Sequence, residues 1–258
     1  MCRLLGLVAN KPVDLEFSLE RFKKFSARNP DGWGIGWYEE GKSEVFKQGI
    51  SAIDEESKLP ELSKKVISNI VISHVRQGTL GGSSKVNSHP FLYENWIFAH
   101  NGAIDREFFL DKLKGRYRDR IEGETDSEVY FYWILQNIEE QGDTISGIRE
   151  AVNQVKTRGH TGMNFLLSDG KCLYAFRYSS NSRNYYSLFV LKRNPSDPGP
   201  FEHISKETRA LLISKALKRE RAVLVCSEKL TEEDWHEIGF GEILKINSDL
   251  SIESVNIL

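Results

Sequence analysis

The order of strand-like and helix-like segments is the feature that most constrains the fold of this chain. Strand-like apolar segments occupy residues 2–8, 33–38, 68–76 and 96–99, and helical patterns follow over residues 106–113, 127–138 and 144–155. Strand-like segments then return after Met163. Strands and helices that come in separate groups favour a layered α+β fold over a parallel sheet of alternating strands and helices.

Weaker patterns complete the expected element order. They predict helices over residues 15–25, 60–66 and 205–217, strands over residues 186–191, 222–226, 242–246 and 252–255, a mobile loop over residues 77–90, and an exposed loop over residues 194–200. Residues 164–177 resemble a hairpin, because the turn pair Asp169-Gly170 separates two apolar runs. Thr125 stands three residues before Glu128, a capping-box spacing that predicts the start of the second long helix.

Residues 31–38 form an unusual strand, in which Gly32, Gly34 and Gly36 alternate with large side chains. One face of such a strand is bare, and glycine at these positions indicates close approach of another backbone or of a ligand. The spacing lacks the last glycine of a dinucleotide-binding loop, and no helical pattern follows it. We therefore expect another backbone or a ligand to approach this strand closely, and we do not expect a phosphate loop of the strand-then-helix type.

Composition excludes several classes of protein. The chain has 258 residues, with 40% hydrophobic and 28% charged side chains, and its 35 basic and 37 acidic residues give a net charge of −2. This balance predicts no nucleic-acid partner and no acidic-membrane partner. No apolar run approaches the roughly 20 residues of a membrane helix, and no signal sequence is recognised, so a cytoplasmic location is the default expectation. We find no repeat or linker and expect one domain.

The three cysteines are Cys2, Cys172 and Cys226, and their wide spacing predicts neither disulfides nor a metal site. Cys172 and Cys226 lie in apolar stretches and are expected to be buried. Cys2 is different, because removal of Met1 would leave its thiol and a free α-amine on one residue. An α-amine with a pKa of about 7.7–8.0 can take the thiol proton, so Cys2 is a candidate nucleophile with its own general base.

Four polar islands stand at the ends of strands or at the start of a helix: Cys2, residues 76–79, residues 100–102 and residues 125–128. In this order they resemble the class II glutamine amidotransferases, which are N-terminal-nucleophile hydrolases. The resemblance implies that Cys2 is the nucleophile and that Asn101 and Gly102 form the oxyanion hole. It also implies that Arg76, Thr79 and Asp126 hold the amino-acid end of glutamine.

Further segments resemble the stand-alone subgroup of this family, namely residues 31–34, 87–91, 164–170 and 227–231. Arg28 matches the first residue of a family element that continues through Asp31, and His89 and His100 are further supporting residues. The resemblance implies a four-layer αββα sandwich of the N-terminal-nucleophile hydrolase type. It also implies one glutamine amidotransferase domain over residues 2–258, with Met1 removed and neither a cofactor nor a metal required.

Each predicted role has a structural alternative. Arg76 suits a carboxylate because its guanidinium is a planar fork, yet a lone arginine at a strand end is more often solvated. Asp126 suits an ammonium group, yet it also stands where a helix cap is expected. Asn101-Gly102 is equally typical of a tight turn. His89 and His100 suggest a cysteine–histidine pair, although a terminal amine makes a histidine base unnecessary. The six histidines lack zinc-site spacing.

Three functions remain open from the sequence. The first is hydrolysis of the γ-amide of glutamine, or of a γ-glutamyl compound, through a thioester on Cys2 that releases glutamate and ammonia or an amine. The second is a glutaminase subunit that delivers ammonia to a separate synthase, which would then be its partner. The third is a catalytically silent regulatory module. The combined presence of Cys2, Arg76, Asn101 and Asp126 argues against the third.

Overall fold

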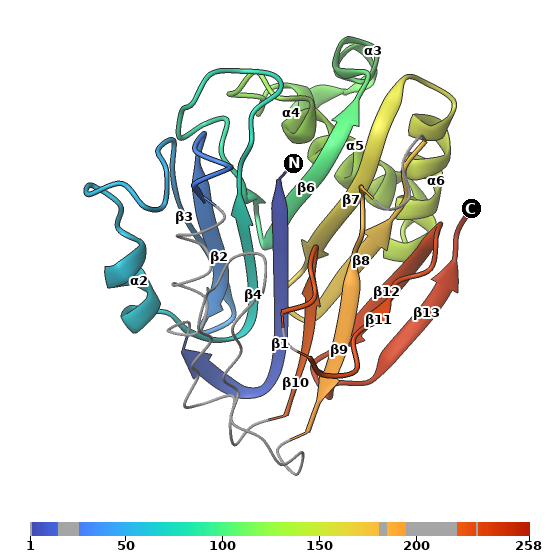
Figure 1. Ribbon diagram of the computed structural model, residues 1–258. Helices are drawn as coiled ribbons and strands as arrows, with labels where there is room; N and C mark the ends of the chain where they lie inside the picture. Colours follow the sequence, from blue (N-terminus) through green and yellow to red (C-terminus); the bar gives the residue numbers. More distant parts are fainter. Residues whose placement is uncertain (1, 15–25, 181–184, 195–220, 231) are drawn as a thin grey trace.

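Two antiparallel β-sheets face each other in the computed structural model, which describes residues 2–14, 26–180, 185–194, 221–230 and 232–258 (Figure 1). The first sheet has the strand order β11-β9-β10-β1-β4-β2-β3 and the second β13-β12-β8-β7-β6-β5. The first sheet contains β1 (Arg3–Asp14), β2 (Trp33–Glu39), β3 (Lys42–Gln48), β4 (Ile67–Val75), β9 (Phe189–Arg193), β10 (Ala222–Cys226) and β11 (His236–Glu237). The second contains β5 (Phe91–Tyr93), β6 (Trp96–Ile104), β7 (His160–Ser168), β8 (Cys172–Arg177), β12 (Glu242–Asn247) and β13 (Ile252–Asn256).

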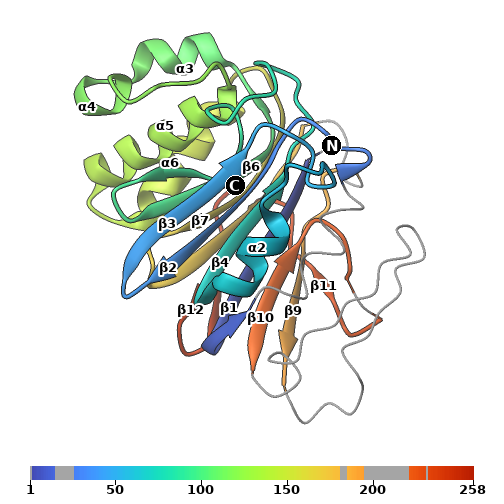
Figure 2. The ribbon, with the colours of Figure 1, turned by 90° about the vertical axis from the view of Figure 1, so that its left-hand side faces the viewer.

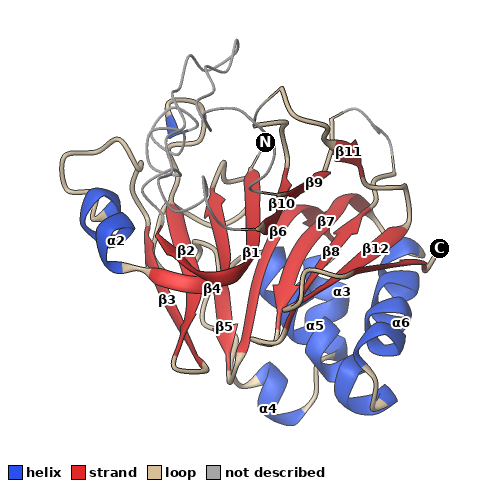
Figure 3. Ribbon diagram, turned by 90° about the horizontal axis from the view of Figure 1, so that it is seen from below, coloured by secondary structure: helices blue, strands red, loops and turns tan. Residues whose placement is uncertain are grey.

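Helices cover the outer faces of this pair of sheets (Figures 2 and 3). The second sheet packs against a helical layer made of α3 (Arg106–Lys112), α4 (Gly115–Arg118), α5 (Asp126–Gln141) and α6 (Thr144–Lys156). The central helix of this layer is α5, of which residues 126–137 are all buried. On the other side, α2 (Leu59–Lys65) packs on the first sheet through Leu59.

The layers therefore follow the order αββα, as expected, and all strand pairs among the described residues are antiparallel, which confirms the α+β class. Within the described residues the layer over the first sheet consists of α2 alone. The helices predicted over residues 15–25 and 205–217 lie outside the described part of the chain, as does most of the predicted loop over residues 194–200.

Glycines let the two sheets approach each other closely. A Cβ atom at Gly36 would lie 2.6 Å from Ile97 of β6, and one at Gly6 would lie 2.8 Å from Leu173 of β8. A Cβ atom at Gly34 would lie 2.3 Å from the carbonyl oxygen of His89. The prediction that the glycine-rich strand marks the close approach of another backbone is thus confirmed at Gly34, where the approaching backbone is that of His89, just before β5. At Gly36 the approaching group is the Ile97 side chain of the second sheet.

The strand predicted over residues 96–99 is longer than expected, because β6 continues through Ile104. Asn101 pairs with Asn164 of β7, and Gly102 pairs with Met163. The prediction that this strand stops at His100, and the alternative of a tight turn at Asn101-Gly102, are therefore wrong. Polar residues suggested a strand end because they usually meet solvent, whereas here both Asn101 and His100 are buried.

Two further expectations need correction. The strand predicted over residues 186–191 begins only at Phe189, because side chains, and not a neighbouring strand, bind the carbonyl group of Tyr186. Cys226 is buried as expected, but Cys172 is only half-buried, and its thiol lies 3.2 Å from Oδ1 of Asn247. Cys172 stands at the start of β8, where the hairpin turn brings it close to the surface.

The start of α5 is close to the prediction. Thr125 is the N-cap residue, and its hydroxyl accepts a hydrogen bond from the Glu128 amide at 3.3 Å. The Glu128 carboxylate does not complete a capping box, because it accepts from the amides of Glu122 and Gly123. This arrangement fixes the chain that leads into α5 and so fixes the position of Asp126.

Candidate active site

One cavity of about 390 Å³ gathers most of the residues that the sequence singled out. It lies where the start of β1, the loop after β4, the end of β6 and the start of α5 meet, so both sheets contribute to it. It is lined by Cys2, Arg76, Gln77, Gly78, Thr79, Leu80, His89, His100, Asn101, Gly102, Ala103, Thr125, Asp126, Ser127, Thr161, Tyr185 and Tyr186. Residues more than 180 positions apart in the sequence therefore share one pocket.

Cys2 is half-buried and lies immediately before β1. Its sulfur lies 3.4 Å from the backbone nitrogen of Gln77 and 3.5 Å from the carbonyl oxygen of Gln77. The thiol can donate to that carbonyl, and a thiolate can accept from that amide. Burial raises the pKa of the Cys2 thiol, so at neutral pH it is protonated and requires a base before it can attack a substrate.

Arg76 is buried at the end of β4, so the alternative of a solvated side chain is wrong. Its Nη2 donates to the carbonyls of Leu80 at 2.6 Å and Gly81 at 3.1 Å. Its Nη1 donates to the carbonyls of Gly82 at 3.2 Å and Asp31 at 3.4 Å. These four bonds account for the four Nη hydrogens. In this state the guanidinium organises the loop that forms one wall of the cavity.

The loop over residues 77–90 has two further anchors. The Asp31 carboxylate accepts from the amide of Gly78 at 2.8 Å and from the hydroxyl of Ser83 at 3.1 Å. The Asn87 side chain donates to the carbonyl of Gly82 at 3.1 Å. The sequence predicted a mobile loop from its glycines and serines, whereas in the structure the loop is hydrogen-bonded to the buried Arg76 and the half-buried Asp31, and internally through Asn87. The role of Asp31 in the glycine-rich segment is therefore structural, because its carboxylate holds the loop in place.

Asn101 and Gly102 reach the cavity from the second sheet. The Nδ2 atom of Asn101 is buried and has no hydrogen-bond partner among the described residues, so it is available to a ligand. Gly102 has a φ of 154°, and a Cβ atom there would lie 1.7 Å from the carbonyl oxygen of Gly162. Only glycine fits at this position, because any side chain would collide with the backbone of β7.

Asp126 is the first residue of α5 and is almost fully buried. Its Oδ2 atom accepts from the amide of Ile104 at 2.9 Å, so Asp126 also fixes the end of β6. Burial raises the pKa of this carboxyl to about 6, while hydrogen bonds from backbone amides oppose the shift. The helix cap itself is Thr125, which leaves the Asp126 carboxylate on the cavity wall.

His89 and His100 both line the cavity and are buried. His100 lies 2.9 Å from the Ser127 hydroxyl and 3.2 Å from the Gly162 carbonyl, and burial lowers its pKa to about 4. The His89 ring is tilted against the His74 ring, with their centroids 4.1 Å apart, and burial holds the pKa of His89 well below the usual range. These histidines are neutral at physiological pH, and neither has a hydrogen bond to Cys2 in the described structure, which favours a structural role.

Thr79 lines the cavity with an exposed side chain, but Arg28 does not line it and is exposed. The structure therefore brings together Cys2, Arg76, Thr79, Asn101 and Asp126, and it leaves Arg28 outside. Sequence reasoning missed the wall formed by Thr161, Tyr185 and Tyr186. The adjacent tyrosines are the available signal in the sequence, although the predicted strand over residues 186–191 includes Tyr186.

The described residues contain no group of three histidine, cysteine or acidic side chains placed to hold a metal ion. Within the same part of the chain, no helix has the length and apolar character needed to cross a membrane.

Comparisons with known proteins agree with this geometry. A model of the class-II glutamine amidotransferases matches residues 1–253. An uncharacterized protein of Methanocaldococcus jannaschii is 35% identical over 257 residues, which cover 95% of this chain and 68% of that protein. Among solved structures, a glutamine aminotransferase class-II domain protein from Silicibacter pomeroyi has a TM-score of 0.67 at 20% identity and covers 99% of both chains.

A longer protein has the same fold in part. The glutamine phosphoribosylpyrophosphate amidotransferase of B. subtilis has a TM-score of 0.64 at 18% identity, over 100% of this chain and 49% of that chain. These likenesses show the N-terminal-nucleophile fold, with its two antiparallel sheets between helices. Since the family model also matches nearly the whole sequence, the chain belongs to the class-II glutamine amidotransferases.

Proposed function

We propose that residues 2–258 form one amidotransferase domain that hydrolyses the γ-amide of glutamine or of a γ-glutamyl compound through a thioester on Cys2. The observation that carries this proposal is the shared cavity, which is lined by a thiol, a partnerless amide nitrogen and a buried carboxylate. Amide hydrolysis through a covalent intermediate requires a nucleophile, a donor for the oxyanion and groups that orient the substrate.

In the proposed reaction, Met1 is removed and the α-amine of Cys2 takes the proton of its thiol. The thiolate attacks the γ-carbonyl carbon, and a C–S bond forms as the carbonyl becomes an oxyanion. The oxyanion collapses, the C–N bond breaks, and the leaving amine receives the proton from the α-ammonium group. Water then attacks the thioester, glutamate leaves, and the thiol is restored. The raised pKa of the Cys2 thiol makes this base necessary.

Asn101 is the proposed donor to the oxyanion through Nδ2, together with the amide of Gly102. Loss of one such donor lowers kcat by about 10²–10³ in comparable enzymes. Asp126 would pair with the α-ammonium of the substrate, and Arg76 and Thr79 would bind its α-carboxylate. Because Arg76 already donates to the loop carbonyls, carboxylate binding would exchange some of those hydrogen bonds for charge-assisted ones. Such an exchange would couple substrate binding to the position of the loop.

A second candidate is a glutaminase subunit that delivers ammonia to a separate synthase. The comparison that favours it is the B. subtilis amidotransferase, of which this fold covers about half. A partner protein would then take the place of the remaining half. This candidate shares the chemistry at Cys2 and differs only in the fate of the ammonia.

The test measures glutamate release from glutamine and from a panel of γ-glutamyl amides, after mass spectrometry has defined the N-terminus. We expect turnover only in protein that begins at Cys2, and none in a Cys2→Ala variant that remains folded. Cys172→Ala is the matched control, because Cys172 lies away from the cavity, and it should retain full activity. Full activity in protein that retains Met1 would contradict the mechanism. Ammonia that is released only when a second protein is added would favour the subunit function.

A further inference from the structure

The predicted nucleophile and the predicted oxyanion donor belong to different sheets. Cys2 precedes β1 in the first sheet, and Asn101 is part of β6 in the second. Their separation therefore depends on what joins the two sheets at this end of the molecule. A displacement of about 1 Å between reacting groups can cost roughly 10²-fold in rate, so any such connection matters for catalysis.

A polar row begins at Asn101 and crosses the second sheet. Asn164 of β7 is directly opposite Asn101, and the register of β7 and β8 places Arg177 beside Asn164. Leu166 and Ala175, two residues further along β7 and β8, face the core between the sheets. Because alternate residues of a strand share a face, the Asn164 and Arg177 side chains point toward the first sheet.

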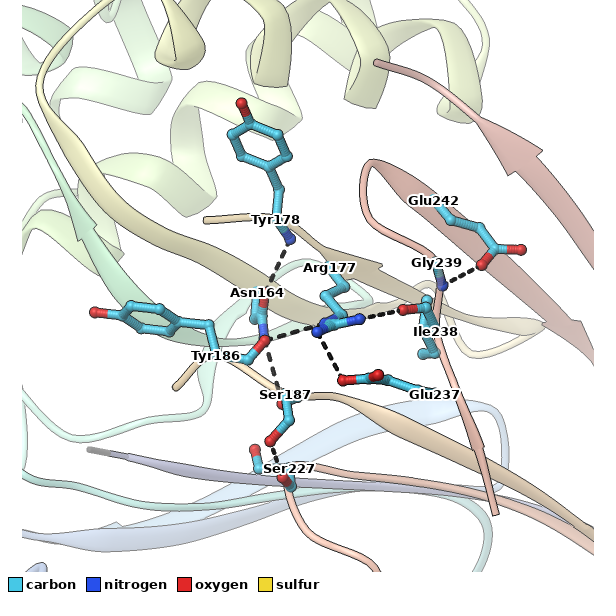
Figure 4. Close-up of polar contacts among 10 residues, drawn as sticks. All are labelled: Asn164, Arg177, Tyr178, Tyr186, Ser187, Ser227, Glu237, Ile238, Gly239 and Glu242. Carbon is cyan, nitrogen blue, oxygen red and sulfur yellow. Dashed lines mark hydrogen bonds and ion pairs between the residues drawn. The ribbon is translucent and has the colours of Figure 1, made fainter. Parts of the chain in front are cut away.

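The polar row binds a short segment, Tyr186–Ser187, which lies between this row and Ser227 and which we call the strap (Figure 4). Nδ2 of Asn164 donates to the carbonyl of Tyr186 at 3.0 Å and to that of Ser187 at 3.5 Å. Nε of Arg177 donates to the same Tyr186 carbonyl at 3.1 Å. The strap is thereby attached to the second sheet by its backbone.

On its other side the strap is attached to the first sheet. The hydroxyl of Ser187 donates to the carbonyl of Ser227 at 2.9 Å, as Figure 4 shows. Ser227 in turn exchanges hydrogen bonds with Leu4: the Ser227 amide donates to the Leu4 carbonyl at 3.1 Å, and the Leu4 amide donates to the Ser227 hydroxyl at 3.0 Å. Leu4 is only two residues from Cys2, so this series of hydrogen bonds connects Asn164 to the strand that presents the thiol.

Arg177 is held firmly enough to serve as an anchor. Its side chain is 7% exposed, its Nη1 donates to the carbonyl of Ile238 at 2.7 Å, and its Nη2 lies 2.7 Å from the Glu237 carboxylate (Figure 4). Three partners in three directions fix the guanidinium plane. A lysine in its place would have a single charged atom and could not reproduce this arrangement.

The strap also contacts the other wall of the predicted oxyanion hole. The Tyr186 hydroxyl donates to Thr161 at 2.9 Å. Its ring lies against Gly162, where a Cβ atom would come within 2.4 Å of the ring. The carbonyl of Gly162 is the same group that a Cβ atom at Gly102 would strike. The strap thus packs against Gly162, the residue that lies next to Gly102.

We propose that the strap, anchored by Asn164 and Arg177 on one sheet and by Ser227 on the other, sets the distance between the Cys2 thiol and the Asn101 amide. Asn164, Arg177 and Ser187 are positioning residues, since they act through the groups that touch the substrate. This inference rests on the proposed function. It also gives a physical role to two segments of the family resemblance, residues 164–170 and 227–231, that the reaction itself does not use.

The experiment is a double-mutant cycle between the strap and the oxyanion donor. Asn164→Asp keeps the acceptor for the Tyr178 amide and removes the donor to the strap, and Ser187→Ala removes the bond to Ser227. Each should lower kcat by roughly 10- to 100-fold in an otherwise native enzyme. In an Asn101→Ala background each of these two changes should lower kcat by less than about threefold. The Asn101 amide, whose position the strap would set, is already absent from that background.

Three controls separate positioning from a general loss of structure. Alkylation of Cys2 by iodoacetamide needs no oxyanion hole and should keep its rate in both variants. Ser187→Thr retains the hydroxyl and should recover most of the activity. Ser43→Ala removes a similar serine-to-carbonyl hydrogen bond far from the cavity and should have no effect. Equal losses in the native and Asn101→Ala backgrounds would overturn the inference, as would slower alkylation.

Labelling with 6-diazo-5-oxonorleucine, a glutamine-shaped electrophile, distinguishes failure of the inference from failure of the proposed function. If the native enzyme is not labelled at Cys2, the proposed function is wrong and the inference falls with it. If the native enzyme is labelled and the two strap variants are labelled equally fast, only the inference is wrong. We expect rapid labelling of the native enzyme and at least tenfold slower labelling of Asn164→Asp and Ser187→Ala.

Discussion

Replacement of Asp126 by asparagine should stabilise the protein while it damages substrate binding. Burial raises the pKa of this carboxyl from 3.8 to about 6, which means that the folded protein holds the charged form unfavourably. Two pKa units at about 1.4 kcal/mol each correspond to roughly 3 kcal/mol of stability lost in the ionised state. Asparagine has almost the same shape, keeps an oxygen for the Ile104 amide and carries no charge.

The sign of the pH dependence follows from the two pKa values. Between about pH 4 and pH 6 the unfolded chain releases the Asp126 proton while the folded protein retains it, so stability falls as pH rises through this window. Below this window the Asp126 carboxyl is protonated in both the folded and the unfolded state, and above it the carboxyl is ionised in both states. The stability advantage of Asp126→Asn should therefore be close to zero at pH 4, grow to pH 6, and remain at roughly 3 kcal/mol at pH 7.5.

Urea unfolding at pH 4, 5, 6 and 7.5 measures this difference in the free energy of unfolding. Asp143→Asn is the matched control, because Asp143 caps α6 at the surface and its hydrogen bonds to Ser146 lower its pKa. Its asparagine variant should be slightly less stable than the native protein above pH 4. In activity assays, Asp126→Asn should raise KM by about 10- to 100-fold through loss of a charged hydrogen bond. An Asp126→Asn protein that is less stable at pH 7.5, or whose advantage does not change with pH, would refute the argument.

The other predictions concern the oxyanion hole and the loop. Asn101→Ala should lower kcat by about 10²–10³ with little change in KM, and a rise in KM alone would assign Asn101 to binding. Gly102→Ala should cost about 3 kcal/mol or more of stability in thermal or urea unfolding, because its Cβ would strike the Gly162 carbonyl. Gly41→Ala is the control and should cost only about 1–2 kcal/mol. Gly41 also has a positive φ, but its Cβ would meet nothing within 4 Å. Arg76→Ala should speed proteolytic cleavage within residues 77–87, because the guanidinium holds three of the loop carbonyls, and an unchanged cleavage rate would contradict that anchoring role.

Predictions made from local patterns were largely correct, for physical reasons that operate within a few residues. Separate groups of strand and helix periodicity indicated the α+β class, and Thr125 with Glu128 marked the start of α5 within one residue. The alternating glycines indicated the close approach of another backbone or of a ligand, because a strand face without side chains leaves room for either. Cys2, Asn101 and Asp126 could be selected because the family resemblance links these residue types in a fixed order.

Only the tertiary structure decided which side chains are buried and which groups they contact. The sequence could not show that His100 and Asn101 are buried within a strand, because polar residues after an apolar run indicate a strand end whenever the opposing surface is unknown. It could not show that the Nη atoms of Arg76 are bound to loop carbonyls. Nor could it show that Arg28 is exposed and outside the cavity, because a motif match does not tell which way a side chain points.

The contacts between the two sheets were the least accessible to the sequence. Ser187 and Ser227 are 40 residues apart, and Asn164 stands 63 residues after Asn101, yet these residues belong to one hydrogen-bonded connection. Such a connection depends on strand register, which a sequence pattern fixes only through the face that each strand buries. The sequence by itself therefore determined which groups are available for chemistry, and the packing of one sheet on the other determined the distances at which they meet.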